Sequence, residues 1–483
     1  MTATDPQMIA NVVEEVLRRM DGSPPKAERL QPLSAPAHHQ PPAPHNTTGL
    51  FQNVDAAVAA ATDAQRQLVN AGVNVRDSIC KLIKRIAVDN APQWGRFELD
   101  ETKVGRLDHK IAKLELLQSV PGVDMLRTAA HSGDDGVGLD EGAPWGVIGV
   151  ITPVTHSIPT MAANAINMIA AGNTMVVNAH PSGAKSVALA TKTFNEAIQR
   201  EFNVGPLICA IDPPTLESAN AIFEHRDIPL LVATGGPAVA RAALKQAKRA
   251  IVAGPGNPPV VVDETADLDN AARSIIQGAA FDNNLLCIGE KEVFVVASVF
   301  DKMMQAMERA GAMRLNAQQV QQLTDKAFDW KTDHYAVNKD FVGKDPHVIG
   351  QLAGFNVPQN IELIFGETDE SNPFVPEEQM MPFVPFVKVR DFNEALDLAL
   401  KHEHGFGHTA IIHSNNLANI TTMGRATNTT IFVANGPCTA GLGIGGEGYP
   451  SYSIATPTGE GITNPMTFTR FRRASIAGAL RIV

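Results

Sequence analysis

Hydrophobic and polar positions follow different patterns in successive stretches of the chain. Between residues 8 and 20, large apolar residues recur in pairs every four positions, with charged or polar residues between them. That spacing draws one apolar stripe along a helix. Asp5-Pro6 and Asp21-Gly22 are typical of a helix start and a helix stop. We therefore predict a short amphipathic helix over residues 6–20.

The next segment has the composition of an extended linker. Residues 23–47 contain seven prolines and almost no large apolar side chains. Such a segment gives the preceding helix nothing to pack against. The helix either folds back onto its own domain or docks on a partner, and we favour docking on a partner.

From residue 49 onward, patterns of buried strands alternate with patterns of helices. Continuous apolar runs, which suit strands buried on both faces of a parallel sheet, occur at 145–152, 174–177, 228–235 and 259–262. Helical patterns lie at 160–171, 186–202, 215–224 and 237–248. A second set has strands at 292–298, 408–414 and 430–436 and a long helical region at 299–325. This order predicts two doubly wound α/β domains with a boundary near residues 253–258.

Composition and charge narrow the classes of function. The 483 residues carry 51 acidic and 40 basic side chains, a net charge of −11, which disfavours a nucleic-acid binder because such proteins need clustered Lys and Arg. No apolar run is long enough to span a bilayer, so a membrane-spanning protein is excluded. Four scattered cysteines are too few for a disulfide framework and suit a reducing compartment.

One cysteine has surroundings that favour a reactive thiol. Cys287 follows a helix of small residues and the polar run 282–284, and it precedes an apolar strand. It is therefore expected at a strand entrance, where backbone N–H groups are free, and Lys291 could lower its pKa. The other three are interpreted as buried packing residues: Cys80, Cys209 and Cys438.

Residues 49–483 contain an ordered series of motifs: APWGVIGVITP, AAGNTMVVNAHP, LLVATGG, AGPGNPPVVVDETADL, FDNNLLC, EEQMMPFVP, EHGFGHTAIIHS, NGPCTAGLGIGGEG and IATPTGEGIT. In these motifs the chain resembles the aldehyde dehydrogenase superfamily, specifically its CoA-acylating branch from bacterial microcompartments that degrade ethanolamine and propanediol. The resemblance implies an α/β fold with two doubly wound parallel-sheet domains and a small oligomerisation arm. The expected divisions are an encapsulation helix at 1–22, a Pro-rich linker at 23–48, an NAD/CoA-binding domain at 49–254 with the arm near 118–143, a catalytic domain at 255–450, and a C-terminal segment at 451–483 with an oligomerisation strand at 466–473.

The resemblance also implies a chemical role for Cys287, which matches the catalytic nucleophile. Its thiolate would attack an aldehyde carbonyl and keep the acyl group as a thioester after hydride transfer to a nicotinamide. Ala253 stands where hydrolytic relatives have the glutamate that activates water. Without that carboxylate, water attack should be slow, and acyl transfer to CoA gains the advantage.

One departure from the family pattern concerns the hydrogen-bond donor for the oxyanion, the negative oxygen that forms when the thiolate attacks the carbonyl. Relatives carry an asparagine after the first strand, whereas this chain reads Pro153-Val154-Thr155-His156-Ser157. Thr155, His156 or the Cys287 backbone N–H could donate instead. We favour His156, with a histidine that merely lines the pocket as the alternative.

The remaining matches concern NAD and CoA. The segment ATGGPAVA at 233–240 replaces the absent GxGxxG motif at a strand-to-helix turn. The implied cofactor contacts are Thr152 and Pro153 near the nicotinamide, His180 and Pro181 near the adenosine of the cofactor or CoA, Thr234, Gly235 and Gly236 at the pyrophosphate, and Glu378 at the nicotinamide ribose. The usual lysine near Asn178 is missing, which leaves NAD or NADP open, with NAD favoured.

The leading hypothesis is a CoA-acylating dehydrogenase for a short aliphatic aldehyde. Propionaldehyde is favoured, acetaldehyde is next, and lactaldehyde remains open. A hydrolytic NAD-dependent dehydrogenase that yields a free acid and a catalytically inactive assembly protein are the alternatives.

The resemblance further implies partners and a location. The helix at 6–20 would bind a microcompartment shell protein and place the enzyme in the lumen of this cytoplasmic compartment, as a homodimer or homotetramer. No nucleic-acid or membrane partner is expected. No metal is expected either, because the histidines at 402, 404, 408 and 413 match no common ligand spacing.

Overall fold

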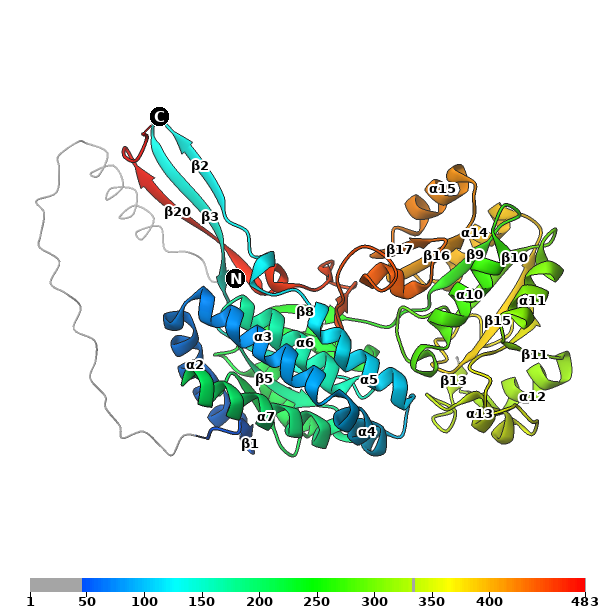
Figure 1. Ribbon diagram of the computed structural model, residues 1–483, viewed down its shortest axis with the longest axis horizontal. Helices are drawn as coiled ribbons and strands as arrows, with labels where there is room; N and C mark the ends of the chain where they lie inside the picture. The colour runs from blue at the N-terminus through cyan, green and yellow to red at the C-terminus, as the bar shows by residue number, and fades with distance from the viewer. Residues whose placement is uncertain (1–45, 332–334, 483) are drawn as a thin grey trace, which may run out of the picture. The chain divides into compact units, whose positions relative to one another are not determined.

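The computed structural model describes residues 46–331 and 335–482 (Figure 1). The predicted helix at 6–20 and the proline-rich segment up to residue 45 lie outside this range. Within it, no helix is long and apolar enough to cross a membrane.

The first sheet contains six parallel strands. Across the sheet they are β1 (Leu50–Phe51), β6 (Ile208–Ile211), β5 (Thr174–Ala179), β4 (Val147–Thr152), β7 (Leu230–Thr234) and β8 (Arg249–Ala253). Every residue of β4, β5, β6 and β7 is buried, which explains their continuous apolar runs. The chain winds in opposite directions on the two sides of β4, so a switch point for ligand binding lies between β4 and β7.

The second sheet contains seven parallel strands. Their order is β11 (Met313–Leu315), β14 (Ile364–Thr368), β15 (Phe383–Val389), β10 (Glu292–Val296), β9 (Pro259–Val262), β16 (Thr409–His413) and β17 (Ile431–Ala434). The accompanying helices are α10 (Leu268–Ala279), α11 (Phe300–Arg309), α12 (Ala317–Ala327), α13 (Pro346–Ala353), α14 (Phe392–His402) and α15 (Leu417–Thr427). The predicted fold class of two doubly wound α/β domains is confirmed.

The long helical region predicted at 299–325 is wrong as a single element. It forms α11 and α12 with edge strand β11 between them. Gly311 has a φ of 104°, a conformation that only glycine adopts readily and that ends the first helix.

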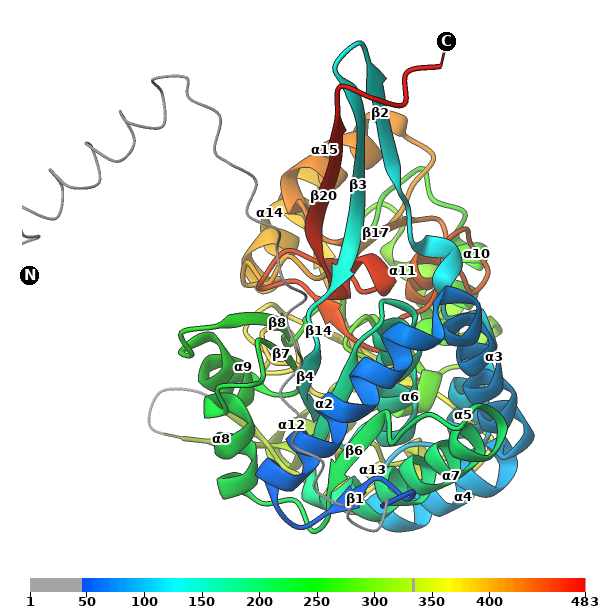
Figure 2. The same ribbon diagram turned by 90° about the vertical axis from the view of Figure 1, so that its left-hand side faces the viewer.

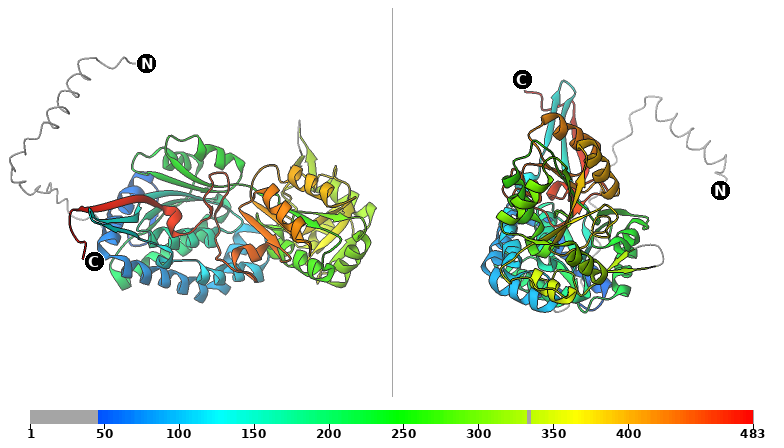
Figure 3. Two further views of the ribbon diagram at one scale, coloured as in Figure 1. Left: turned by 90° about the horizontal axis from the view of Figure 1, so that it is seen from above. Right: turned by 90° about the vertical axis from the view of Figure 1, so that its right-hand side faces the viewer.

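A three-stranded antiparallel sheet joins distant parts of the chain. Its strands are β2 (Ala129–Gly133), β3 (Gly136–Pro144) and β20 (Thr469–Ala477), with β20 paired to β3 along its full length. Figures 2 and 3 show the three strands extending together away from the helices. We call β2, β3 and β20 the arm. Two smaller antiparallel pairs are β12 (Phe328–Trp330) with β13 (Tyr335–Val337), and β18 (Ile454–Ala455) with β19 (Gly461–Ile462).

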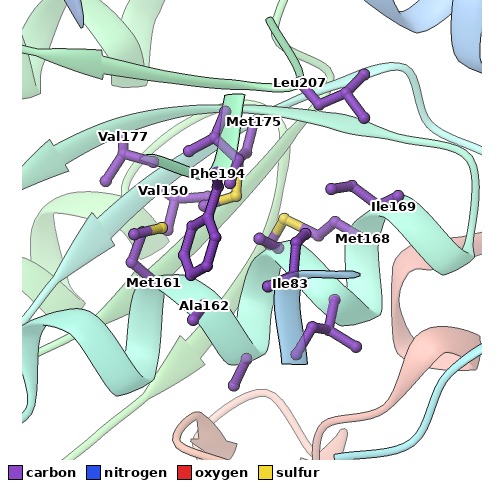
Figure 4. Packing of buried hydrophobic residues seen from close by; sticks show 14 of the residues in the cluster. Ile83, Val150, Met161, Ala162, Met168, Ile169, Met175, Val177, Phe194 and Leu207 are labelled. Atoms are coloured by element: carbon purple, nitrogen blue, oxygen red, sulfur yellow. The ribbon is translucent and has the colours of Figure 1, made fainter. Parts of the chain in front are cut away.

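Helices pack on both faces of the first sheet. One face is covered by α3 (Val73–Asp89), α6 (Ser157–Ala170) and α7 (Ala184–Phe202), and Figure 4 shows Met161 and Phe194 among the residues that pack there. The other face carries α8 (Leu216–Glu224), α9 (Pro237–Leu244) and the start of α2 (Val54–Ala71). Every residue of α6 is buried, because this helix is surrounded by the sheet, α3, α7 and the neighbouring α5 (Leu107–Glu115). Helices α4 (Ala91–Thr102) and α5 (Leu107–Glu115) contact each other beside α3.

Candidate active site

The structure gathers the residues matched to a nucleotide cofactor at one edge of the first sheet. Thr152 ends β4 and pairs with Ala179 at the end of β5, and Thr234 ends the adjacent β7. The predicted positions that follow these strand ends are Pro153, His180, Pro181, Gly235 and Gly236. Gly236 is the N-cap of α9, so free backbone N–H groups of this helix lie at the same edge.

Two hydroxyl groups at this edge differ in their partners. The Thr152 hydroxyl is buried and has no hydrogen-bond partner among the described residues, so it is available to a ligand. The Thr234 hydroxyl lies 2.8 Å from that of Ser453. An orphaned hydroxyl beside a helix N-terminus fits the polar groups of a dinucleotide.

Cys287 lies in a tight loop between α10 and β10. The three residues at 282–284 have φ values of 49°, 56° and 62°, a left-handed run that needs external support. Asn284 Nδ2 donates to the Glu290 carbonyl at 2.9 Å, and Asn283 Nδ2 donates to the Gly343 carbonyl at 3.0 Å. This loop leaves Cys287 partly exposed, whereas the other three cysteines are buried, as predicted.

A cavity of about 40 Å³ opens beside Cys287. Its wall is mostly apolar and consists of Lys113, Leu116, His156, Phe281, Leu286, Cys287, Ile288, Thr439, Leu442, Ile444, Ser451, Tyr452 and Ile454. This volume holds roughly three water-sized groups. The cavity therefore has room for a small molecule with a short apolar chain.

Burial dominates the acidity of the Cys287 thiol. It raises the pKa of the thiol to about 12, the nearby Glu378 carboxylate raises it further, and the Lys291 ammonium lowers it. Lys291 thus lowers the pKa of the thiol, as predicted, but burial raises this pKa by more. Its Nζ donates to the Asn284 carbonyl at 2.8 Å and also to the side-chain oxygen of Asn284. The thiol is protonated at neutral pH and needs a base before it can react.

Of the two positions that the resemblance matches to carboxylates, Ala253 carries a methyl group and Glu378 carries a carboxyl group. Ala253 ends β8 and pairs in register with Thr234. Burial raises the pKa of Glu378, while Lys291 and a hydrogen bond from the Gly256 backbone lower it. Glu378 is therefore close to the thiol, to Lys291 and to the Gly256 backbone.

His156 forms part of the cavity wall immediately before α6. Burial and the charges of Lys113 and Lys110 lower the pKa of its imidazole well below the usual value, so the ring is neutral at pH 7. Its Nδ1 is buried without a partner among the described residues. Thr155, in contrast, does not line the cavity, and its carbonyl accepts hydrogen bonds from two lysines. Of these two oxyanion candidates, His156 alone borders the cavity.

Sequence reasoning missed several residues of the site. Lys113 and Tyr452 line the cavity, and the Tyr452 hydroxyl donates to the Lys113 carbonyl at 2.7 Å. His408 is fully buried, and its Nε2 has no partner in the described part of the chain. A Cβ at Gly256 would lie 2.5 Å from the Cys287 carbonyl oxygen and 3.0 Å from the His408 ring. The motifs AGPGNPP and EHGFGHT contained the last two positions, but their spacing gave no sign of this contact.

The histidine-rich segment at 402–413 forms no ligand set. In residues 46–331 and 335–482, no group of three or more His, Cys, Asp or Glu side chains is placed to hold a metal ion.

The sequence profile of the aldehyde dehydrogenase family matches residues 27–449. The chain belongs to the aldehyde dehydrogenase family. It is 42% identical over 482 residues to the acetaldehyde dehydrogenase (acetylating) EutE of Salmonella typhimurium, with 99% of each chain covered.

Two solved structures of this family are similar to the chain. A propionaldehyde dehydrogenase of Rhodopseudomonas palustris, with bound CoA and an acylated cysteine, has a TM-score of 0.88 and 40% identity, covering 90% of this chain and 100% of that chain. A propionaldehyde dehydrogenase from the fucose utilisation microcompartment of Clostridium phytofermentans has a TM-score of 0.87 and 39% identity, with the same coverage. These likenesses confirm the resemblance to the CoA-acylating branch of the family.

Proposed function

We propose that this CoA-acylating aldehyde dehydrogenase oxidises propionaldehyde with NAD and CoA to propionyl-CoA, through a thioester on Cys287. The observation that carries the proposal is the placement of Cys287 and neutral His156 on the wall of one small cavity. The orphaned Thr152 hydroxyl, the N-terminus of α9 and Glu378 would hold the nicotinamide cofactor.

The chain's own residues account for the attack and for the developing charge. The Cys287 thiol passes its proton to the nearby Glu378 carboxylate, and its Sγ, as a thiolate that the Lys291 charge favours, bonds to the aldehyde carbon. The carbonyl oxygen then becomes negative, and the neutral His156 ring donates an N–H to it. Bound NAD would supply the hydride acceptor. The acyl group would then remain on Cys287 Sγ until the CoA thiol, giving up its proton, takes the acyl group and releases the Cys287 thiolate.

The residue at the end of β8 supports CoA over water as the acyl acceptor. The Ala253 methyl group supplies no base at this position, so the thioester should persist until a thiol arrives. NADH formation should therefore require CoA after the first turnover. Steady-state NADH formation that is equally fast without CoA would favour the hydrolytic alternative.

The cavity volume supports an aldehyde of two or three carbons. Acetaldehyde is the alternative to propionaldehyde as the substrate. One methylene in an apolar pocket changes kcat/KM by about 10- to 200-fold. We expect kcat/KM to be highest for propionaldehyde among acetaldehyde, propionaldehyde and lactaldehyde. A higher value for acetaldehyde would assign that substrate. The same assay with NAD and NADP should give the lower KM for NAD.

We further infer that the segment at 6–20, which the sequence predicts to be an amphipathic helix, is an encapsulation peptide that binds a shell protein of a bacterial microcompartment. The similarity to a microcompartment enzyme supports this role. Deleting residues 1–22 should leave kcat of the purified enzyme unchanged but release the enzyme from isolated compartments. Retention of the truncated enzyme in those compartments would contradict the role.

Exposed apolar side chains on the arm favour a homodimer or homotetramer as the assembly of the protein. Its strand β20 exposes Phe471 at 70% and Ile476 at 48%, and exposed apolar side chains along one strand suit an interface with a second copy.

A further inference from the structure

Four charged side chains form a buried network beside the cavity. They are Glu98 on α4, Lys110 and Lys113 on α5, and Asp282 ahead of Cys287, and each is at most 2% exposed. Two ammonium groups balance two carboxylates. Removing four charges from water is costly, and replacing such networks by apolar residues is often neutral or stabilising. Stability alone therefore explains this network poorly.

One end of the network holds the loop that carries His156. The ammonium groups of the two lysines both donate to the Thr155 carbonyl, at 3.3 and 3.1 Å. Glu98 binds one of these ammonium groups through Oε1 at 3.1 Å, and its Oε2 accepts the Ile158 N–H at 3.0 Å. The backbone is thus fixed on both sides of the imidazole.

The other end holds the loop that carries Cys287. The Lys113 ammonium also donates to Asp282 Oδ2, while Asp282 Oδ1 accepts the backbone N–H of Arg106 at 2.9 Å. Asp282 is the first residue of the left-handed run in this loop. Lys113 itself lines the cavity together with the thiol and the imidazole.

We propose that Lys113 is a positioning residue of the reaction. By joining the Thr155 carbonyl to the Asp282 carboxylate, its ammonium sets the separation of the imidazole and the thiol across the cavity. Lys110 binds the same carbonyl but makes no hydrogen bond to the loop of Cys287, so it positions only the loop of His156. This inference rests on the proposed role of His156. A misplacement of about 1 Å lowers a rate about a hundredfold.

The test compares two equally buried lysines on one helix. Lys113→Met removes the ammonium with little change of volume, and Lys110→Met is the matched control. We expect Lys113→Met to lower kcat about a hundredfold with KM for the aldehyde and for CoA changed by less than about threefold, and Lys110→Met to lower kcat by less than about tenfold. The Tm of both variants should be lower than that of the wild type. Equal losses of kcat in the two variants would show a merely structural role and overturn the proposal.

A double-mutant cycle with His156→Ala tests the connection itself. In the Lys113→Met background, this substitution should lower kcat by less than about threefold, because the imidazole is already misplaced. Fully additive losses would overturn the proposal. Unchanged kcat in His156→Ala alone would remove the role of the imidazole and the proposal with it, while CoA-dependent NADH formation would still stand. If Lys113→Met does not fold, the double variant with Asp282→Asn, which removes both charges, replaces it throughout.

Discussion

At the scale of single residues, burial sets the protonation of the groups around the thiol. Burial raises the pKa of Cys287 to about 12 and lowers that of His156 well below its usual value. Both groups are therefore uncharged at neutral pH. An uncharged imidazole keeps one N–H for an oxyanion, and the nearby Lys291 charge favours the thiolate when the proton leaves.

The role of His156 gives a prediction about turnover. His156→Ala removes the proposed oxyanion donor, and losing one such donor costs about 100- to 1,000-fold in kcat. His156→Asn restores an amide N–H and should recover much of this loss. Steady-state kcat with saturating aldehyde checks both variants. An Ala variant within about threefold of the wild type would mean that the ring only lines the pocket.

Glu290 gives a prediction about stability and pH. Burial raises the pKa of this carboxyl to about 7 from an ordinary 4.5. The folded protein holds the proton more tightly than the unfolded chain, so stability from this group is complete below about 4.5 and is lost as pH rises through about 7. Glu290→Gln should remove that loss, which amounts to roughly 3 kcal/mol. Urea unfolding of both proteins from pH 4.5 to 8 measures it, and parallel curves would contradict the prediction.

At the scale of elements, the buried strands were predictable and the site network was not. Strand β9 coincides with the continuous apolar run at 259–262, because both faces of it are covered. Strand β8 begins with exposed Arg249 and gave no such run. The contact of Lys113 with Asp282 joins residues 169 positions apart, and no local pattern marks such a pair. Cys287 was singled out because its flanking motif is specific, whereas Lys110 and Lys113 stand in a segment that belongs to none of the motifs.

The arm carries a prediction of its own. Phe471→Asp places a charge on exposed β20 and should shift the protein to a smaller assembly in light scattering at unchanged helix content. Arg472 is the neighbouring residue on this strand and points to its other face, so Arg472→Ala is the control. An unchanged mass for Phe471→Asp would place the interface elsewhere.

At the scale of the molecule, over residues 46–331 and 335–482, both domains contribute side chains to the active site. The first domain supplies His156 and the nucleotide edge, and the second supplies Cys287. Further bonds connect the two, including the Gly105 N–H to the Gly343 carbonyl at 2.8 Å and Arg106 to Glu362 at 2.9 Å. Catalysis should therefore depend on contacts between the domains as well as on the residues of the cavity wall.

Mass spectrometry of the peptide that contains Cys287 shows whether the reaction passes through a thioester on this residue. The enzyme is incubated with propionaldehyde and NAD, first without CoA and then with CoA. We expect a propionyl adduct on Cys287 that persists without CoA and disappears as propionyl-CoA forms, and no adduct in Cys287→Ala. An adduct on another residue, or one that water removes as fast as CoA does, would contradict it.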